Sequence, residues 1–341
     1  MDFELENEDA TIAFFMMKFA SSFDSLRDNL KQVQRVLEEE THASDLLTRR
    51  VSRDLLAGRG KGVRPALLLM MYQTVKRSNT LPRSLIRLAA MIEMIHSASV
   101  VHDDIIDESV LRRGQKALHV KWGTKMSILM GDLLYARSAM LIASDGNMDV
   151  LEVVSRSVSD MCRGQMKELN NVFNWNLSER HYVDIIRDKT GVLFSAACEV
   201  GAIMAGATTA GRRAASQYGM HIGLAFQIMD DVLDLTGSDG VLGKPVGLDL
   251  REGRITLPVI LAMRKAAPKD RKIFKGTLHA KGKKLSEVGE KLAHQYGGVE
   301  SARNHIKEYA ASARESLEAL DPSSGRMALE MVARMAGERT N

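Results

Sequence analysis

Three stretches of helical length carry almost no charge, and this pattern restricts the fold more than any other feature of the sequence. Residues 88–101 contain one charged residue, Glu93; residues 214–229 contain none; and residues 190–211 contain only Glu199. A helix that is apolar on every side must be surrounded by other protein, because water would otherwise contact its apolar surface. The chain is therefore predicted to be all-α, with helices at the centre of a bundle that other helices cover.

Composition favours the same fold class. The 341 residues include 20 methionines but only 6 prolines and 5% aromatic residues. Helix formers are thus plentiful and the residues that sheets favour are scarce, which argues against a β-sandwich. Helical patterns follow one another without a Ser/Gly-rich linker or a low-complexity segment. A single domain over residues 1–341 is expected, with residues 1–20 as a peripheral N-terminal segment.

Charge and targeting features favour a cytoplasmic protein. The formal net charge of +4 is too small to indicate nucleic-acid binding. Five of the first ten residues are acidic, unlike a secretory signal or an organelle transit peptide. No apolar run reaches the 18 or so uninterrupted residues that a membrane span needs. Residues 264–284 form a basic run, which is a solvated surface or, alternatively, a contact for an anionic membrane or a polyanion.

Two of the uncharged stretches lead into the same acidic motif, DDxxD. Asp103 and Asp107 follow the first stretch, and Asp230 and Asp234 follow the second. Positions i and i+4 share one face of a helix, so each pair of carboxylates would repel unless a cation lay between them. Carboxylate oxygens suit Mg²⁺, which shares its coordination with substrate phosphates. One DDxxD is more often a solvated helix turn; two copies after apolar helices predict a metal site with these four ligands.

Basic residues beside glycine turns could bind the same anionic ligand as the metal ions. Each is by itself an ordinary surface charge, but together with two acidic motifs they predict a polyphosphate site. The segment GRGKG is not a phosphate-binding Walker A loop, because no Lys-Ser/Thr pair follows it. These basic residues are Lys61, Arg64, Arg112, Arg113, Lys189, Lys244, Arg251 and Arg254.

The motifs taken in order resemble the trans-isoprenyl diphosphate synthases, and within them the polyprenyl (octaprenyl/solanesyl-like) branch. The similarity covers about residues 20 to 335. It implies the isoprenoid synthase fold, a single large bundle of antiparallel helices around a central cavity, and a homodimer. The motifs are Lys61-x-x-Arg64-Pro65, His102-Asp103-Asp104-x-x-Asp107, Arg112-Arg113-Gly114, Gly131-Asp132, Lys189-Thr190, Phe226-Gln227-x-x-Asp230-Asp231-x-x-Asp234, Gly243-Lys244 and Asp249-Leu250-x-Glu252-Gly253-Arg254.

The resemblance also implies roles for individual residues. Up to three Mg²⁺ ions would lie on an allylic diphosphate, held by Asp103, Asp107 and Asp230 with help from Asp104, Asp231 and Asp234. The same diphosphate would be neutralised by Arg112, Lys189 and Lys244. The second substrate, isopentenyl diphosphate, would be bound by Lys61, Arg64, His96 and Arg113.

Several positions call for comment within that scheme. Thr190 and Gln227 could aim oxygen dipoles at the allylic cation. His96, seven residues before Asp103, is on residue type alone as much a core histidine as a substrate ligand. Arg254, expected at the substrate, stands where lysine is common, and Gly62 stands where arginine is common.

Small residues before the first acidic motif predict a long product. Ser99 and Ala98 precede Asp103 by four and five positions, which places them about 6–7.5 Å from it along a helix. In the family, short-chain enzymes carry a bulky aromatic residue near here, and Ala139 stands at a second position of variable size. The resemblance thus favours a product of seven to ten isoprene units. The alternative is that Ala98 and Ser99 only allow close helix packing.

The predicted function is a prenyltransferase that adds isopentenyl diphosphate to an allylic diphosphate by Mg²⁺-assisted ionisation and builds a medium- or long-chain all-trans product. A short-chain (farnesyl or geranylgeranyl) synthase and a non-catalytic subunit of a heteromeric synthase remain alternatives. A terpene cyclase or a head-to-head synthase fits less well, because Lys61 and Arg64 accompany a second motif that repeats DDxxD. A typical cyclase lacks the second diphosphate site and carries a mixed Asn/Ser/Glu metal motif. A weak membrane association would suit a long apolar product, and the primer and exact product length stay open.

Overall fold

The protein is a bundle of helices. The computed structural model describes residues 26–42, 45–57, 62–112, 114–237, 247–278 and 282–337. Within these residues the strands are confined to one short antiparallel hairpin, β1 (Leu111–Arg112) and β2 (Gln115–Lys116). The prediction of an all-α protein is therefore confirmed. The predicted peripheral segment, residues 1–20, lies outside the described residues.

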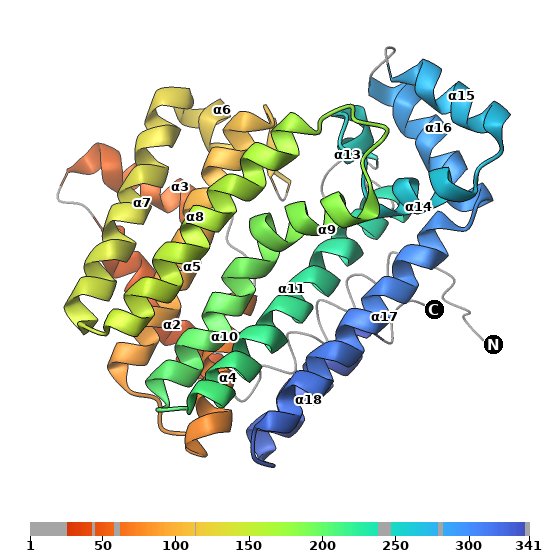
Figure 1. Cartoon of the computed structure of the whole chain (residues 1–341). Helices are drawn as coiled ribbons and strands as arrows, with labels where there is room; N and C mark the ends of the chain where they lie inside the picture. The colour runs from red at the N-terminus through yellow and green to blue at the C-terminus, as the bar shows by residue number, and fades with distance from the viewer. Residues whose placement is uncertain are drawn as a thin grey trace, which may run out of the picture.

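The helices follow one another through the bundle (Figure 1). In chain order they are α2 (Arg27–Glu40), α3 (Leu46–Ala57), α4 (Val63–Lys76), α5 (Arg83–Ile106), α6 (Leu118–Trp122), α7 (Thr124–Asp145), α8 (Met148–Asn170), α9 (Glu179–Ile186), the π-helix η2 (Arg187–Gly191), α10 (Val192–Met204), α11 (Thr209–Thr236), α13 (Leu248–Arg251), α14 (Leu257–Lys265), α15 (Pro268–Thr277), α16 (Gly282–Gln295), α17 (Gly298–Ser316), the 3₁₀-helix η3 (Leu317–Ala319) and α18 (Ser324–Gly337).

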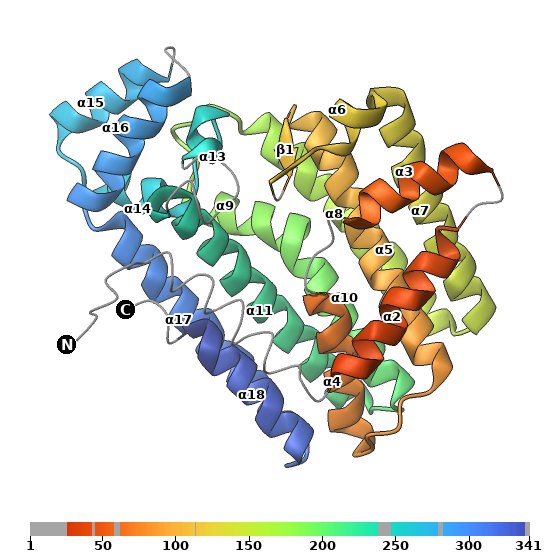
Figure 2. The ribbon, with the colours of Figure 1, turned by 180° about the vertical axis from the view of Figure 1, so that it is seen from behind.

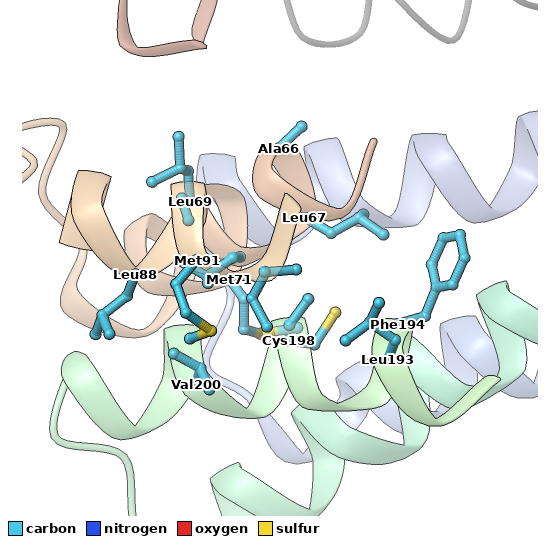
Figure 3. Packing of buried hydrophobic residues seen from close by; sticks show 14 of the residues in the cluster. Ala66, Leu67, Leu69, Met71, Leu88, Met91, Leu193, Phe194, Cys198 and Val200 are labelled. Atoms are coloured by element: carbon cyan, nitrogen blue, oxygen red, sulfur yellow. The ribbon is translucent and has the colours of Figure 1, made fainter. Parts of the chain in front are cut away.

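The uncharged stretches form the interior, as their sequences require. Helices α4, α5 and α10 pack with Leu67, Met71, Met91 and Cys198 fully buried between them (Figure 3). The third uncharged stretch differs from the other two. The stretch 190–211 is not a single helix, because α10 ends at Met204 and a turn with a left-handed glycine, Gly206 at φ 80°, precedes α11.

Helix α11 connects two hydrophobic clusters. Its N-terminal half, with Tyr218 and Ile222, belongs to the cluster around α4, α5 and α10. Its C-terminal half, with Ile228 and Val232, belongs to a second cluster with α9, α14, α16 and α17. Seen from both sides, α11 lies between α10 and α17, while α15 and α16 form one corner (Figures 1 and 2). The second acidic motif is thus carried by the helix that joins the two clusters.

Two helices, α5 and α7, are long and apolar enough to cross a membrane by length and composition. The core helix of a bundle passes the same test. In α5, 67% of the most apolar window is buried inside the protein, and in α7 the share is 39%. The hydropathy of α5 is thus explained by its place in the core, whereas α7 leaves much of its apolar surface exposed.

Candidate active site

The first acidic motif lies where α5 ends. The helix stops at Ile106, and the Asp107 N–H donates to the Asp103 carbonyl at 2.8 Å. Asp104 is buried and lies 3.6 Å from the guanidinium Nη1 of Arg112, on β1. Burial raises the pKa of Asp103 to about 6; the charge of Lys189 opposes this shift, and Asp107 adds to it. This end of α5 thus concentrates negative charge that a cation would stabilise.

The second acidic motif lies within α11, two residues before its end at Thr236. Asp230 is exposed, whereas Asp231 and Asp234 are 3% and 1% exposed. An Asp234 oxygen accepts the Asp249 N–H at 3.1 Å. Asp231 has side-chain donors instead: Gln227 Nε2 lies 2.9 Å from its Oδ1, and the Tyr182 hydroxyl donates to its Oδ2. The three aspartates of one motif therefore meet three different environments.

One arginine joins the two motifs. Arg254 Nη1 lies 3.2 Å from Asp107, and its Nη2 lies 2.9 Å from Asp249 and also pairs with Glu252. Burial alone would lower the pKa of Arg254, but these carboxylates outweigh it and raise the pKa. Because the Asp249 backbone binds Asp234, a continuous path of contacts runs from the end of α5 to the end of α11. The structure thus brings the two motifs and Arg254 together.

Lys189 and Thr190 occupy a π-helical turn, η2, between α9 and α10. A π turn inserts one extra residue, and such turns recur at functional sites. Lys189 pairs with Glu168 of α8, while the Thr190 hydroxyl donates to Gln227 Oε1 of α11 at 2.8 Å. Helix α8 approaches η2 closely because residue 164 is glycine. A Cβ there would lie 2.4 Å from the backbone nitrogen of Lys189. Two neighbouring side chains are in this way directed to two different helices.

Two residues predicted to bind different substrates meet at one pocket: His96 was predicted to bind isopentenyl diphosphate, and Arg112 the allylic diphosphate. His96 and Arg112 line it, together with Asp104 and the lysines Lys116 and Lys121. Four elements form its walls, namely α3, α5, the β1–β2 hairpin and α6.

Arg64 lies at the start of α4, where its guanidinium stacks at 4.3 Å from the ring centre of Phe194. Gly62 caps this helix at φ 64°, a left-handed conformation that favours glycine. This conformation gives a physical reason for a glycine where arginine is common in the resemblance.

Of the residues predicted to set chain length, the structure buries one. Ala98 is fully buried on α5, and Ser99 is half-buried with its hydroxyl donating to the His96 carbonyl at 2.8 Å. Ala139 is exposed on α7 in the single chain. It therefore does not line an interior cavity of one chain with Ala98, contrary to the expectation of a second level in the same tunnel.

Three predicted residues, Lys61, Arg113 and Lys244, lie outside the described residues. Among the residues that are described, no three histidine, cysteine, aspartate or glutamate side chains gather closely enough to hold a metal ion alone. The donors present are carboxylate oxygens at i, i+4 spacing beside Arg254. Such a set fits a magnesium ion that takes its remaining ligands from water and substrate phosphates.

The structure also shows site neighbours that carry no signal in the sequence. Glu168 pairs with Lys189, and Tyr182 binds Asp231, although each partner is distant along the chain. A glutamate on a long amphipathic helix and a lone tyrosine look like any others. Only the packing of α8 and α9 against η2 and α11 identifies them.

Comparisons with known proteins identify the family. A family model described as polyprenyl synthetase matches residues 46–295. A short chain isoprenyl diphosphate synthase of Methanothermobacter thermautotrophicus is 36% identical over 310 residues, which cover 90% of this chain and 94% of that protein. The octaprenyl diphosphate synthase of Escherichia coli strain K12 is 32% identical over 308 residues, with the same two coverages.

A solved structure gives the same answer for the fold. The polyprenyl synthase of Caulobacter crescentus, described as complexed with calcium and isoprenyl diphosphate, superposes with a TM-score of 0.87 at 31% identity. The match covers 94% of this chain and 97% of that one. The isoprenoid synthase fold expected from the motifs is confirmed, and the chain belongs to the polyprenyl synthetase family of prenyltransferases, the trans-prenyl diphosphate synthases.

Proposed function

We propose that the enzyme condenses isopentenyl diphosphate with an allylic diphosphate, and that Mg²⁺ at the two acidic motifs assists departure of the allylic diphosphate. The observation that carries this proposal is the path of contacts from Asp107 through Arg254 and Asp249 to Asp234. This path holds the carboxylate oxygens of both acidic motifs at one site. A diphosphate that binds several Mg²⁺ ions requires such oxygen ligands around it. Bound Mg²⁺ would act as a Lewis acid on the leaving diphosphate.

The chain's own residues supply the rest of the chemistry. Lys189 and Arg112 offer fixed positive charge to the leaving diphosphate, which stabilises the charge that develops there. Thr190 and Gln227 present oxygen atoms that favour the allylic cation, and no enzyme nucleophile is needed. The bond forms when the double bond of isopentenyl diphosphate attacks that cation, and the released diphosphate takes the proton.

Incubation with Mg²⁺, isopentenyl diphosphate and farnesyl diphosphate tests this function. We expect a longer prenyl diphosphate, inorganic diphosphate, and no product in the presence of EDTA. A cyclic hydrocarbon would indicate a cyclase. Absence of any reaction with farnesyl, geranyl and dimethylallyl diphosphates would favour a non-catalytic subunit.

The second-substrate site gives an independent test. Arg64→Ala should raise KM for isopentenyl diphosphate about tenfold or more, because a charge-assisted contact to phosphate is worth about 1.5–3 kcal/mol. KM for the allylic substrate should change little. Steady-state kinetics with each substrate varied in turn would decide it, and an effect confined to the allylic substrate would reverse the assignment. Lys61→Ala is expected to behave in the same way.

We further propose a medium- or long-chain product of seven to ten isoprene units. The support is the small, fully buried Ala98 one turn before the first acidic motif. The short-chain alternative has support of its own, since a relative with that name is 36% identical. Chromatography of the dephosphorylated products distinguishes the two.

Ala98→Tyr tests how chain length is set. A ring at this buried position would block the space beyond it, so we expect shorter products while turnover is largely kept. Ala98→Gly is the matched control, because it changes the same buried position without adding bulk. If Ala98→Tyr leaves the product length unchanged, the growing chain does not pass Ala98.

We also propose a homodimer that forms through α7. This helix exposes Ile128, Leu129 and Met140, which are 42%, 62% and 56% accessible. A stripe of exposed apolar residues on one helix suits a partner surface. Sedimentation should give twice the monomer mass, and Leu129→Arg should lower it. In that arrangement Ala139 would face the partner rather than solvent.

The cytoplasm is the proposed location, with weak membrane association for a long apolar product. The separation of cell extracts tests both: the enzyme should be mostly in the soluble fraction and should bind vesicles only after product forms. A tight membrane fraction without product would contradict the proposal.

A further inference from the structure

A chain of three hydrogen bonds runs from α9 through α11 to η2. The Tyr182 hydroxyl donates to Asp231 Oδ2; Gln227 Nε2 donates to Asp231 Oδ1 at 2.9 Å; and the Thr190 hydroxyl donates to Gln227 Oε1 at 2.8 Å. Tyr182, Asp231 and Thr190 are 3%, 3% and 8% exposed. These buried polar groups depend on one another for partners, because water has little access to them.

The direction of each bond follows from the chemistry of Asp231. Its two oxygens face two donors, so the amide of Gln227 must turn its NH₂ group to Asp231 and its carbonyl to Thr190. A proton on Oδ2 would not change this, because the phenol oxygen facing Oδ2 accepts as well as donates. Oδ1 remains the acceptor for Gln227 in either case. With Oδ1 as the acceptor, the orientation of Gln227 is thus set by Asp231.

The orientation of Gln227 in turn determines which part of Thr190 faces the site. With the Gln227 carbonyl accepting its hydrogen, the Thr190 oxygen is left with its lone pairs for the substrate. A flipped Gln227 would donate to Thr190 and free the hydroxyl hydrogen, so a positive dipole end would replace a negative one. An allylic cation is stabilised by the first arrangement and opposed by the second.

Asp231, for which the resemblance implied a helping role at the metal, differs from the neighbouring proposed ligand Asp230. Both of its oxygens are engaged by protein donors, whereas Asp230 beside it is exposed. Tyr182 is tied to the protein rather than to the site: its N–H donates to the Ser178 carbonyl at 2.9 Å, and its ring lies in the second hydrophobic cluster. The polar atoms of Tyr182 and Asp231 therefore bind protein groups rather than substrate or metal.

We propose that Tyr182 and Asp231 are positioning residues that hold Gln227 with its carbonyl toward Thr190, so that both side chains present oxygen to the allylic cation. This inference rests on the proposed function. Outer partners of this kind typically contribute about 10- to 100-fold to activity at other sites. The effect should appear in kcat, because the cation exists only after substrate is bound.

The experiment compares Tyr182→Phe with Tyr218→Phe in the full-length enzyme. Both remove a buried hydroxyl that donates a hydrogen bond; the Tyr218 hydroxyl binds the Leu329 carbonyl at 2.9 Å, in the first hydrophobic cluster. Thermal unfolding shows whether both variants fold. We expect Tyr182→Phe to lower kcat about tenfold, with both KM values and the half-saturating Mg²⁺ concentration within about twofold of wild type. Tyr218→Phe should keep the wild-type kcat.

Asp231→Asn is the second variant. Asparagine can donate to the Gln227 carbonyl and so permit the flipped amide, and kcat should fall further than in Tyr182→Phe. Equal kcat values for wild type, Tyr182→Phe and Tyr218→Phe would overturn the inference while the proposed function stands. A parallel change in Mg²⁺ half-saturation would also overturn it, because these residues would then act on the metal site. A wild-type enzyme that transfers no prenyl group would overturn the proposed function first.

Discussion

The two acidic motifs share the sequence DDxxD but are stabilised by different chemistry. In the first motif the partners are guanidinium groups: Arg112 lies near Asp104, and Arg254 lies near Asp107. In the second, the described partners are neutral donors: a phenol and an amide for Asp231, and a backbone N–H for Asp234. The same five-residue pattern is thus charge-compensated at the end of α5 and hydrogen-bonded within α11.

The middle aspartate of a DDxxD motif thus meets different partners in the two copies. We propose that Asp104 balances a cation that faces the substrate, whereas Asp231 orders the side chains around it. The helix ends explain part of the contrast. Helix α5 stops at Ile106 and is followed by the hairpin that brings Arg112, while α11 continues past its motif into the second hydrophobic cluster.

The largest expected effect comes from the first aspartate of each motif, where the two should behave alike. Asp103→Ala and Asp230→Ala should each lower kcat about 100-fold or more. Each removes a carboxylate ligand of the metal ions that would stabilise charge in the transition state. The measurement is turnover at saturating substrates over a range of Mg²⁺ concentrations. Near-normal turnover in either variant would exclude that motif from metal binding.

Arg254 should come next, because it joins the two motifs. Arg254→Gln leaves Asp107, Asp249 and Glu252 without their shared cation, so we expect a loss of about 1.5–3 kcal/mol in stability, as for hydrogen bonds to charged groups, and a marked fall in kcat. Arg254→Lys keeps the charge but not the planar fork, and should be intermediate. Chemical denaturation and turnover check both.

The control for Arg254 is Arg264→Gln. Arg264 is an exposed arginine that pairs with Glu179, and such a pair is worth about 1 kcal/mol or less. If Arg254→Gln were no more destabilising than this control, the contact path between the motifs would have no energetic weight.

The smallest effect should separate the two middle aspartates. Asp104→Asn removes the negative charge that pairs with the half-exposed Arg112. KM for a diphosphate substrate should therefore rise by about fivefold or less, while kcat is kept. Asp231→Asn should instead lower kcat. Asp104→Asn combined with Arg112→Gln should show a non-additive effect if the pair acts together. A lower kcat in Asp104→Asn together with a higher KM in Asp231→Asn would contradict the distinction between the motifs.

The sequence was sufficient for the parts of the site that depend on local patterns. Uncharged helical stretches predicted the core, and the repeated DDxxD predicted that α5 and α11 carry paired carboxylates. Contacts between distant segments had no such pattern: nothing near Asp231 points to Tyr182, and nothing near Lys189 points to Glu168. Ala139 illustrates a related limit: residue size indicates what would fit a cavity but not which face of α7 is exposed on the single chain.

The π turn η2 has a consequence for how this protein can change in length. One inserted residue rotates everything after it by about 100° relative to an α-helix. Removing a single residue from Arg187–Gly191 would restore ordinary α-helical phase and turn the faces of α10 away from α4 and α5. Insertions and deletions are therefore expected to be tolerated in exposed connections such as the one at Gly146, between α7 and α8, and to be excluded from this turn across otherwise divergent relatives.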